Sequence, residues 1–189
     1  MLMDAPPEKE DCVPFVTIDE FFDTNGVRVP HIVAKDLEQG FLLLEDFGDV
    51  LLSTQLDDKT VDAHYEQSFK QLIQLQSIDG EGHFPAYSYE KLMTEMSLLT
   101  DWLLPSLQIQ PSDDESALIK RTFAILANAA LAQPQVIVHR DFHSRNLMLL
   151  VDEQEQGVID FQDAVIGADT YDPVSYTHLT LPTSDLVEI

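Results

Sequence analysis

Two short apolar runs separated by polar residues mark the C-terminal part of the chain. Residues 147–151 (LMLLV) and 157–161 (GVIDF) enclose the polar stretch 152–156 (DEQEQ). Apolar runs of this length around a polar turn predict an antiparallel hairpin. In such a hairpin the start of the first strand lies beside the end of the second. The pattern therefore predicts that Asn146 and Asp160 lie at the same end of the hairpin.

Apolar residues recur at three- and four-residue intervals in four longer segments. These segments are residues 15–25, 58–77, 89–104 and 112–131, with Pro105 and Pro111 as breaks. This spacing places apolar side chains on one helical face and predicts four helices. The first is predicted to end at Asn25-Gly26, a favourable C-terminal cap. We expect the apolar stripes to be core, with Trp102 buried among them.

The remaining apolar runs predict short strands. Residues 1–3 resemble the end of a strand that the Ala-Pro-Pro of 5–7 terminates, and residues 31–35 and 40–44 flank a polar turn. Residues 136–138 form another short run just before a polar loop. Long helices combined with short antiparallel strands predict the α+β fold class.

Composition and charge narrow the functions. The 189 residues carry a formal net charge of −24, from 34 acidic and 10 basic residues. Nucleic-acid binding depends on Lys and Arg to neutralise phosphates, so we expect no nucleic-acid partner, and no anionic membrane surface for the same reason. No apolar run has the length of a membrane span. Cys12 is the single cysteine, which excludes an internal disulfide and fits a cytoplasmic location.

Residues 139–146 (HRDFHSRN) carry the candidate chemistry. Asp141 and Asn146 have the Asp-x-x-x-x-Asn spacing of a kinase catalytic loop, in which Asp accepts the proton of the substrate hydroxyl. Asn146 and Asp160 would offer oxygens to one Mg²⁺ ion. Taken alone, the His-Arg-Asp triplet or the hairpin with its terminal Asp would favour a purely structural role, since either pattern can occur by chance. Their order, followed by Gly167 and Asp172-Pro173, favours a kinase-type site.

With these motifs in place, the chain resembles the aminoglycoside phosphotransferase/choline kinase superfamily. Residues 3–12 (MDAPPEKEDC), 43–48 (LLEDFG) and 160–164 (DFQDA) are similar to the bacterial cell-wall amino-sugar kinases. The resemblance implies a protein-kinase-like, two-lobed fold with a truncated N-terminal lobe and a mainly helical C-terminal lobe. It implies ATP and Mg²⁺ as cofactors and a small-molecule sugar as the substrate. Aminoglycoside or other small-molecule phosphorylation, and a catalytically inactive kinase-like fragment, remain alternatives.

The resemblance also assigns supporting residues. Glu45 and Phe47 stand where a kinase hinge would contact the adenine, and Glu20 stands on the helix that offers an acid to the strand lysine. His139 is expected to support the catalytic loop without performing chemistry. Asp172 resembles the buried Asp that holds this loop through its backbone N–H groups.

Two departures from a complete kinase bear on the domain organisation. The seven glycines never approach a Gly-x-Gly-x-x-Gly loop, and Lys9 lies in a Pro/Glu-rich loop, not on a strand. Residues 1–48 are therefore expected to be a partial N-terminal lobe with the hinge, and residues 49–175 a truncated C-terminal lobe. Residues 176–189 resemble a non-native read-through tail. We expect little activity from this chain by itself.

Overall fold

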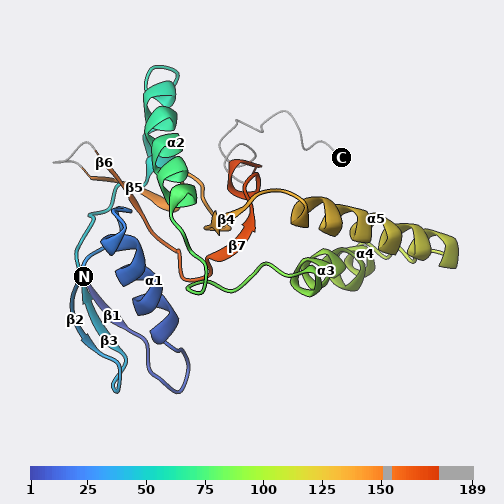
Figure 1. Cartoon of the computed structure of the whole chain (residues 1–189), viewed down its shortest axis with the longest axis horizontal. Coiled ribbons are helices and arrows are strands. Elements are labelled where there is room, and N and C mark those ends of the chain that lie inside the picture. Colours follow the sequence, from blue (N-terminus) through green and yellow to red (C-terminus); the bar gives the residue numbers. More distant parts are fainter. Residues whose placement is uncertain (151–154, 175–189) are drawn as a thin grey trace.

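The N-terminal part of the chain is a three-stranded antiparallel sheet with one helix beside it. In the computed structural model, which describes residues 1–150 and 155–174, strands β1 (Leu2–Asp4), β2 (Ile32–Asp36) and β3 (Phe41–Leu44) pair in the order β1-β3-β2 (Figure 1). The buried side of β3 presents Leu42 and Leu44 to a small core that includes Val16 of the helix. The three predicted strands are confirmed, although β2 begins at Ile32, one residue later than predicted.

Helix α1 (Val13–Thr24) begins two residues before the predicted start. Asp11 accepts a hydrogen bond from the Val13 backbone N–H at 2.9 Å, and Pro14 stands in the first turn, where its missing N–H costs nothing. The helix ends at Asn25, and Gly26 follows with φ of +78°, as the predicted C-terminal cap requires.

Two strand pairs carry the polar loop that the sequence singles out. Strand β4 (Gln135–Val138) pairs with β7 (Val165–Ala168), and β5 (Leu147–Leu150) pairs with β6 (Glu155–Val158), with Leu147 opposite Val158. The predicted hairpin is confirmed, but its second strand is shifted towards the N-terminus. Asp160 takes a left-handed backbone conformation with φ of +64°, which cannot continue a strand.

The main core joins α1, the strand pairs and helix α2 (Val61–Ser77). It contains Phe22, Leu75, Ile137 and Phe161, each essentially inaccessible to solvent. Helix α2 begins three residues later than predicted because Thr60 donates its backbone N–H to the Asp57 carboxylate at 2.9 Å in a preceding turn. Cys12 is buried.

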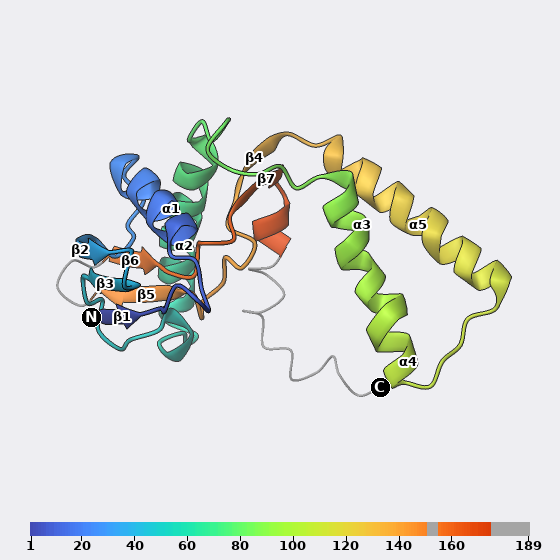
Figure 2. The ribbon, with the colours of Figure 1, turned by 90° about the horizontal axis from the view of Figure 1, so that it is seen from below.

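A projecting arm is formed by α3 (Tyr89–Leu98), a π-helical turn (Leu99–Leu103), α4 (Leu104–Ser106) and α5 (Asp113–Leu131) (Figure 2). The prediction that its apolar stripes are core is wrong for the described part of the chain. No residue of α3 is buried, Ala127 is the one buried residue of α5, and the side chain of Trp102 is 73% exposed. Pro105 lies inside α4 and does not end the helical segment, since a first-turn proline is tolerated.

Helix α5 begins with a capping box. Ser112 accepts from the Glu115 backbone N–H while the Glu115 carboxylate accepts from that of Ser112. The first turn of α5 is acidic, with Asp113, Asp114 and Glu115.

Within residues 1–150 and 155–174 no helix combines the length and apolarity needed to cross a bilayer.

Candidate active site

The predicted proximity of Asn146 and Asp160 is confirmed at the end of the β5–β6 hairpin. The Asn146 side-chain amide donates to the Asp160 carboxylate at 3.3 Å and to the backbone carbonyl of Asp141 at 3.0 Å. The Ile159 N–H also donates to the Asn146 carbonyl at 3.1 Å, which continues the ladder past the last strand pair. One amide side chain thus connects the predicted base segment to the predicted metal carboxylate.

Asp160 has a strained backbone conformation, and the two residues that follow it are held by contacts of their own. Its φ of +64° costs about 1–3 kcal/mol for a residue with a side chain, and such strain persists only where the surroundings enforce it. Phe161 is fully buried and stacks on Phe15 with 5.1 Å between ring centroids. Gln162 donates to the other Asp160 carboxylate oxygen at 2.8 Å. The exposed carboxylate is therefore fixed in direction.

Asp172 holds the loop that carries Asp141. Its buried carboxylate accepts backbone N–H groups from His139 at 2.7 Å and Arg140 at 2.9 Å. Burial raises the pKa of Asp172 to about 6, while the backbone hydrogen bonds act in the opposite direction. Arg140 itself has φ of +81°, so the loop is strained at this residue too.

His139 connects the loop to the exit of the hairpin. Its Nε2 lies 3.0 Å from the Ile159 carbonyl, and its Nδ1 accepts the Asp141 N–H at 3.3 Å. A carbonyl can only accept and an N–H can only donate, so the ring carries its proton on Nε2. Burial lowers the His139 pKa to about 4, which keeps the ring neutral near pH 7. Both ring nitrogens of His139 are engaged by backbone groups, so the ring is placed to support the loop.

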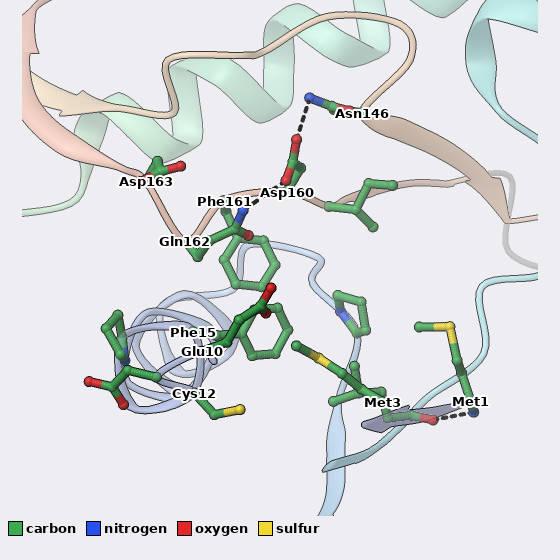
Figure 3. A pocket seen from close by; sticks show the side chains of 15 residues that line it. Met1, Met3, Glu10, Cys12, Phe15, Asn146, Asp160, Phe161, Gln162 and Asp163 are labelled. Carbon is green, nitrogen blue, oxygen red and sulfur yellow. Dashed lines mark hydrogen bonds between the residues drawn. The ribbon is translucent and has the colours of Figure 1, made fainter. Parts of the chain in front are cut away.

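A cavity of about 640 Å³ opens beside Asn146 and Asp160 (Figure 3). The sheet and the start of α1 supply a mostly apolar wall, which includes Met1, Met3, Cys12, Pro14, Phe15, Pro30 and Leu44. The hairpin end supplies polar groups on the opposite side. An apolar pocket with a few convergent polar groups is the usual form of a small-molecule site.

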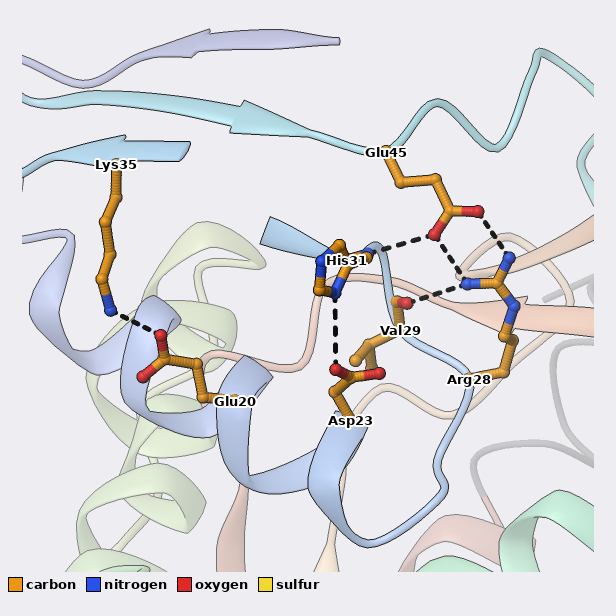
Figure 4. A network of polar contacts seen from close by, with 7 residues as sticks. All are labelled: Glu20, Asp23, Arg28, Val29, His31, Lys35 and Glu45. Carbon is orange, nitrogen blue, oxygen red and sulfur yellow. Dashed lines mark hydrogen bonds and ion pairs between the residues drawn. The ribbon is translucent and has the colours of Figure 1, made fainter. Parts of the chain in front are cut away.

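The two predicted hinge side chains lie outside this cavity lining. Glu45 forms a bidentate ion pair with Arg28, at 2.7 and 2.6 Å, and accepts the His31 N–H at 3.2 Å (Figure 4). The hydrogen bond from Arg28 is the main cause that lowers the Glu45 pKa. The Phe47 ring lies 4.7 Å from the Arg28 guanidinium, and a Cβ on Gly157 would come within 2.2 Å of it. Packing of the Phe47 ring on adenine is therefore not part of this arrangement, and a backbone role for the hinge stays a prediction.

Glu20 is exposed, and it forms an ion pair with Lys35 of β2 at 2.5 Å (Figure 4). The pair links α1 to β2, an edge strand of the sheet. Lys35 is not on β1, the strand that precedes the helix, so the pair does not have the predicted kinase arrangement.

The hairpin end suits Mg²⁺ by the chemistry of its donors. In the described residues no cluster of three or more His, Cys, Asp or Glu side chains forms a metal cage. Mg²⁺ does not need one, because it is usually held by one or two carboxylates together with substrate phosphates and water. Asp160 and the amide oxygen of Asn146 fit that pattern.

Several supporting residues were not predicted. Gln156 is buried on β6 and bonds to Ser68 and the His64 carbonyl of α2, and Glu95 of α3 pairs with Arg140. Each contact joins residues more than forty positions apart, so no local spacing signals it. Strand β7 is also absent from the predicted elements, because a four-residue run containing Gly167 has no strand-like alternation.

The fold and the convergent hairpin end are similar to those of kinase-like phosphotransferases. The chain belongs to the phosphotransferase enzyme family abbreviated APH, whose family model matches residues 1–186. This confirms the predicted superfamily.

Among individual proteins, the chain is 43% identical over 173 residues to the N-acetylmuramate/N-acetylglucosamine kinase of Pseudomonas aeruginosa, covering 91% of this chain and 51% of that protein. It is 36% identical over 178 residues to the protein of the same name in Neisseria meningitidis, covering 92% and 52%. The chain thus spans about half the length of these relatives.

Solved structures share the fold. The ADP-bound aminoglycoside phosphotransferase APH(2'')-Ib superposes with a TM-score of 0.60 at 22% identity, over 84% of this chain and 57% of that one. The enzyme APH(3'')-Id from Streptomyces rimosus gives 0.64 at 14% identity, over 94% and 70%. The predicted kinase-like fold is confirmed.

Proposed function

We propose that the protein containing this sequence transfers the γ-phosphoryl group of ATP to a hydroxyl of an amino sugar, of the N-acetylmuramate or N-acetylglucosamine class. One observation carries the proposal: Asn146 bonds both to the Asp141 segment and to the Asp160 carboxylate, at 3.0 and 3.3 Å, beside an apolar cavity. The names of the relatives at 43% and 36% identity supply the acceptor class.

Asp141 acts in this proposal on the acceptor. Its carboxylate orients the sugar hydroxyl and takes its proton as the oxygen attacks phosphorus. An ordinary carboxylate suffices, because phosphoryl transfer has a loose transition state and depends mainly on positioning and charge neutralisation. His139 and Asp172 hold the Asp141 backbone in place through the contacts described above.

Asn146 and Asp160 act on the nucleotide. They would hold Mg²⁺, which when bound neutralises phosphate charge. Asp160 suits this task because Phe161 anchors its backbone and Gln162 fixes its carboxylate. The apolar cavity would take the adenine, with the hinge at Glu45 and Phe47 contributing backbone groups.

The main alternative is a different acceptor. The two aminoglycoside phosphotransferases above share the fold at 22% and 14% identity, whereas the two amino-sugar kinases above are 43% and 36% identical in sequence. The higher identities favour an amino sugar. The protein is proposed to act in the cytoplasm on a small molecule, without nucleic-acid or membrane partners.

Asp141→Asn is the direct test, made in the full-length parent, meaning the natural reading frame that contains residues 1–174. Loss of a general base should lower kcat by about 10²–10⁴-fold. The Kd for Mg·ATP should stay within about twofold, because the residue acts on the acceptor. Asp58→Asn, the same change on an exposed loop, is the control. Parallel loss of kcat and nucleotide affinity, or no loss, would remove Asp141 from the base role.

Two further measurements complete the test. Asp160→Ala should abolish Mg²⁺-dependent nucleotide binding in calorimetry, since it removes the carboxylate that is proposed to hold the ion. Product analysis with N-acetylmuramate, N-acetylglucosamine and an aminoglycoside then decides the acceptor. Phosphorylation of the aminoglycoside alone would replace the amino-sugar assignment.

A further inference from the structure

Arg140, directly before the predicted base Asp141, is joined to the projecting arm. Its Nη2 donates to the Glu95 carboxylate of α3 at 2.9 Å, and its guanidinium lies 5.7 Å from the centre of the Tyr87 ring. The Arg140 side chain is 22% exposed, whereas both side chains of the Lys70–Glu66 pair on α2 are about 70% exposed. A partly buried ion pair is less screened by solvent and ions than an exposed one.

Glu95 also accepts a hydrogen bond from Tyr87, which precedes α3. The Tyr87 hydroxyl donates to the Glu95 carboxylate, and the same hydroxyl lies 3.3 Å from that of Tyr171. Burial raises the Tyr87 pKa, so the phenol keeps its proton and remains a donor. Tyr171 directly precedes Asp172, whose carboxylate holds the Arg140 N–H. Glu95 is therefore bound to Arg140, a residue of the catalytic loop, and to Tyr87, whose ring lies beside the Arg140 guanidinium.

The loop needs such contacts at this residue. Arg140 has φ of +81°, a conformation that costs about 1–3 kcal/mol and persists only where surroundings impose it. Asp172 fixes the Arg140 backbone from one side, and Glu95 fixes its side chain from another. Asp163, three residues after Asp160, lies 3.9 Å from the Arg140 Nη1. One side chain thus contacts α3 and the segment after the predicted metal ligand.

We propose that Glu95 is a positioning residue, and that its ion pair with Arg140 aligns Asp141 for phosphoryl transfer by fixing the catalytic loop against α3. The proposal rests on the proposed function for its rate effect. The geometry does not depend on which hydroxyl is phosphorylated, because the contacts of Glu95 are with the protein side chains Arg140 and Tyr87.

The test is Glu95→Gln in the full-length parent, which keeps the shape and removes the charge. We expect kcat to fall at least tenfold, while KM for ATP and the Kd for Mg·ATP change less than twofold. Glu95→Asp should recover part of kcat, because the charge returns on a shorter side chain. Glu66→Gln, which removes the acid of the exposed Lys70 pair, should leave kcat unchanged.

A second readout separates alignment from general stability. Amide hydrogen exchange at residues 139–141 should rise in Glu95→Gln, while exchange in the β1–β3–β2 sheet and the melting temperature stay close to wild type. Unchanged kcat and unchanged loop exchange would overturn the proposal. Equal losses of kcat, nucleotide affinity and melting temperature would also overturn it, since they indicate a structural role only.

The two proposals fail in different ways. If the wild-type parent phosphorylates no amino sugar, the proposed function fails, and loop exchange still decides whether Glu95 fixes the loop. If the wild type is active and Glu95→Gln retains full kcat with ordinary loop exchange, the positioning role fails alone.

Discussion

The catalytic segment and the arm follow equally regular sequence patterns, yet they differ in how their side chains are satisfied. From the end of β4 to the residues just after β7, the side chains of His139, Asn146 and Asp172 each have a hydrogen-bond partner within the site. Along the arm, Leu118, Ile125 and Leu126 of α5 are exposed to solvent. In the catalytic segment these polar side chains have protein partners, whereas on the arm these apolar side chains face solvent.

The difference separates local from tertiary information. An apolar repeat at helical spacing predicts that a helix forms and which face is apolar, but it does not supply the surface that covers that face. A short polar loop beside a hairpin finds hydrogen-bond partners nearby in the sequence, because the second strand of the hairpin ends next to the start of the first; Asn146, for example, bonds to Asp141 and Asp160. The comparison can be challenged in both regions.

The largest effect is expected from Asp172→Ala in the full-length parent. It leaves the His139 and Arg140 N–H groups buried without their acceptor, and each hydrogen bond to a charged group is worth about 1.5–3 kcal/mol. Activity should fall below detection, and urea unfolding should show a loss of several kcal/mol, of the order of the sum of those two bonds. Asp114→Ala, the same change on an exposed arm position, should alter stability by less than about 1 kcal/mol. Similar effects at both positions would erase the distinction between the regions.

A smaller effect is expected where the hairpin meets the hinge. In Gly157→Ala the new Cβ would come within 2.2 Å of the Phe47 ring, so the ring must move, and overpacking of this kind costs about 1–3 kcal/mol. Thermal unfolding should show this loss, and Phe47→Leu should relieve part of it in the double variant. Gly167→Ala on β7 is the control, because its nearest neighbours would lie at 3.3 Å. If Gly157→Ala is as stable as wild type, the Phe47 ring can move to accept the added methyl group without cost.

Asp19 of α1 differs from these side chains, because it is buried and only partly satisfied. Its carboxylate is buried on α1, one oxygen has no partner among the described residues, and burial raises its pKa to about 7 from 3.8. The folded state therefore binds this proton more tightly than the unfolded state, so the contribution of Asp19 to stability falls as pH rises from about 4 to 7.

Asp19→Asn should remove this dependence. The melting temperature of the variant minus that of wild type should increase between pH 4 and 7 and level off above. The low pKa of His139 gives the opposite slope, but it is common to both proteins and cancels in the difference. Asp58→Asn, on an exposed loop, should give a flat difference curve; a flat curve for Asp19→Asn would show that its carboxyl is not desolvated in solution.

Much of the site could be predicted because its geometry is local. A five-residue spacing within one loop and a hairpin register determine where Asp141, Asn146 and Asp160 lie. The roles of these residues, and of Glu45, Phe47 and Asp172, stay predictions until the variants are measured. The proposed tail at residues 176–189 lies outside the described residues, and the lobe boundaries at residues 48 and 175 also remain predictions.

The errors share a physical cause. Trp102 and the stripes of α3 and α5 were expected to be core because apolar faces are usually covered, yet their cover depends on segments far away in sequence. The Glu95–Arg140 pair joins residues forty-five positions apart, so it has no local signature. The contact between Phe47 and Gly157 was also not predicted, because the two residues lie far apart in the sequence; Gly157, which has no side chain, leaves the space that the Phe47 ring fills.

The most direct comparison of the two regions is expected from one substitution made on two helices, and its exposed member should give the smallest effect. Leu75 of α2 is 1% exposed and Leu126 of α5 is 54% exposed. In residues 1–189, Leu75→Ala should cost about 2–5 kcal/mol in urea unfolding, because it leaves a cavity in the core. Leu126→Ala should change stability by less than about 0.5 kcal/mol, because its side chain is already in contact with water. If the two losses are equal at all protein concentrations, another part of the chain covers the arm. If the Leu126→Ala loss appears only at high concentration, a second copy covers it, and the open face of the arm is then an interface.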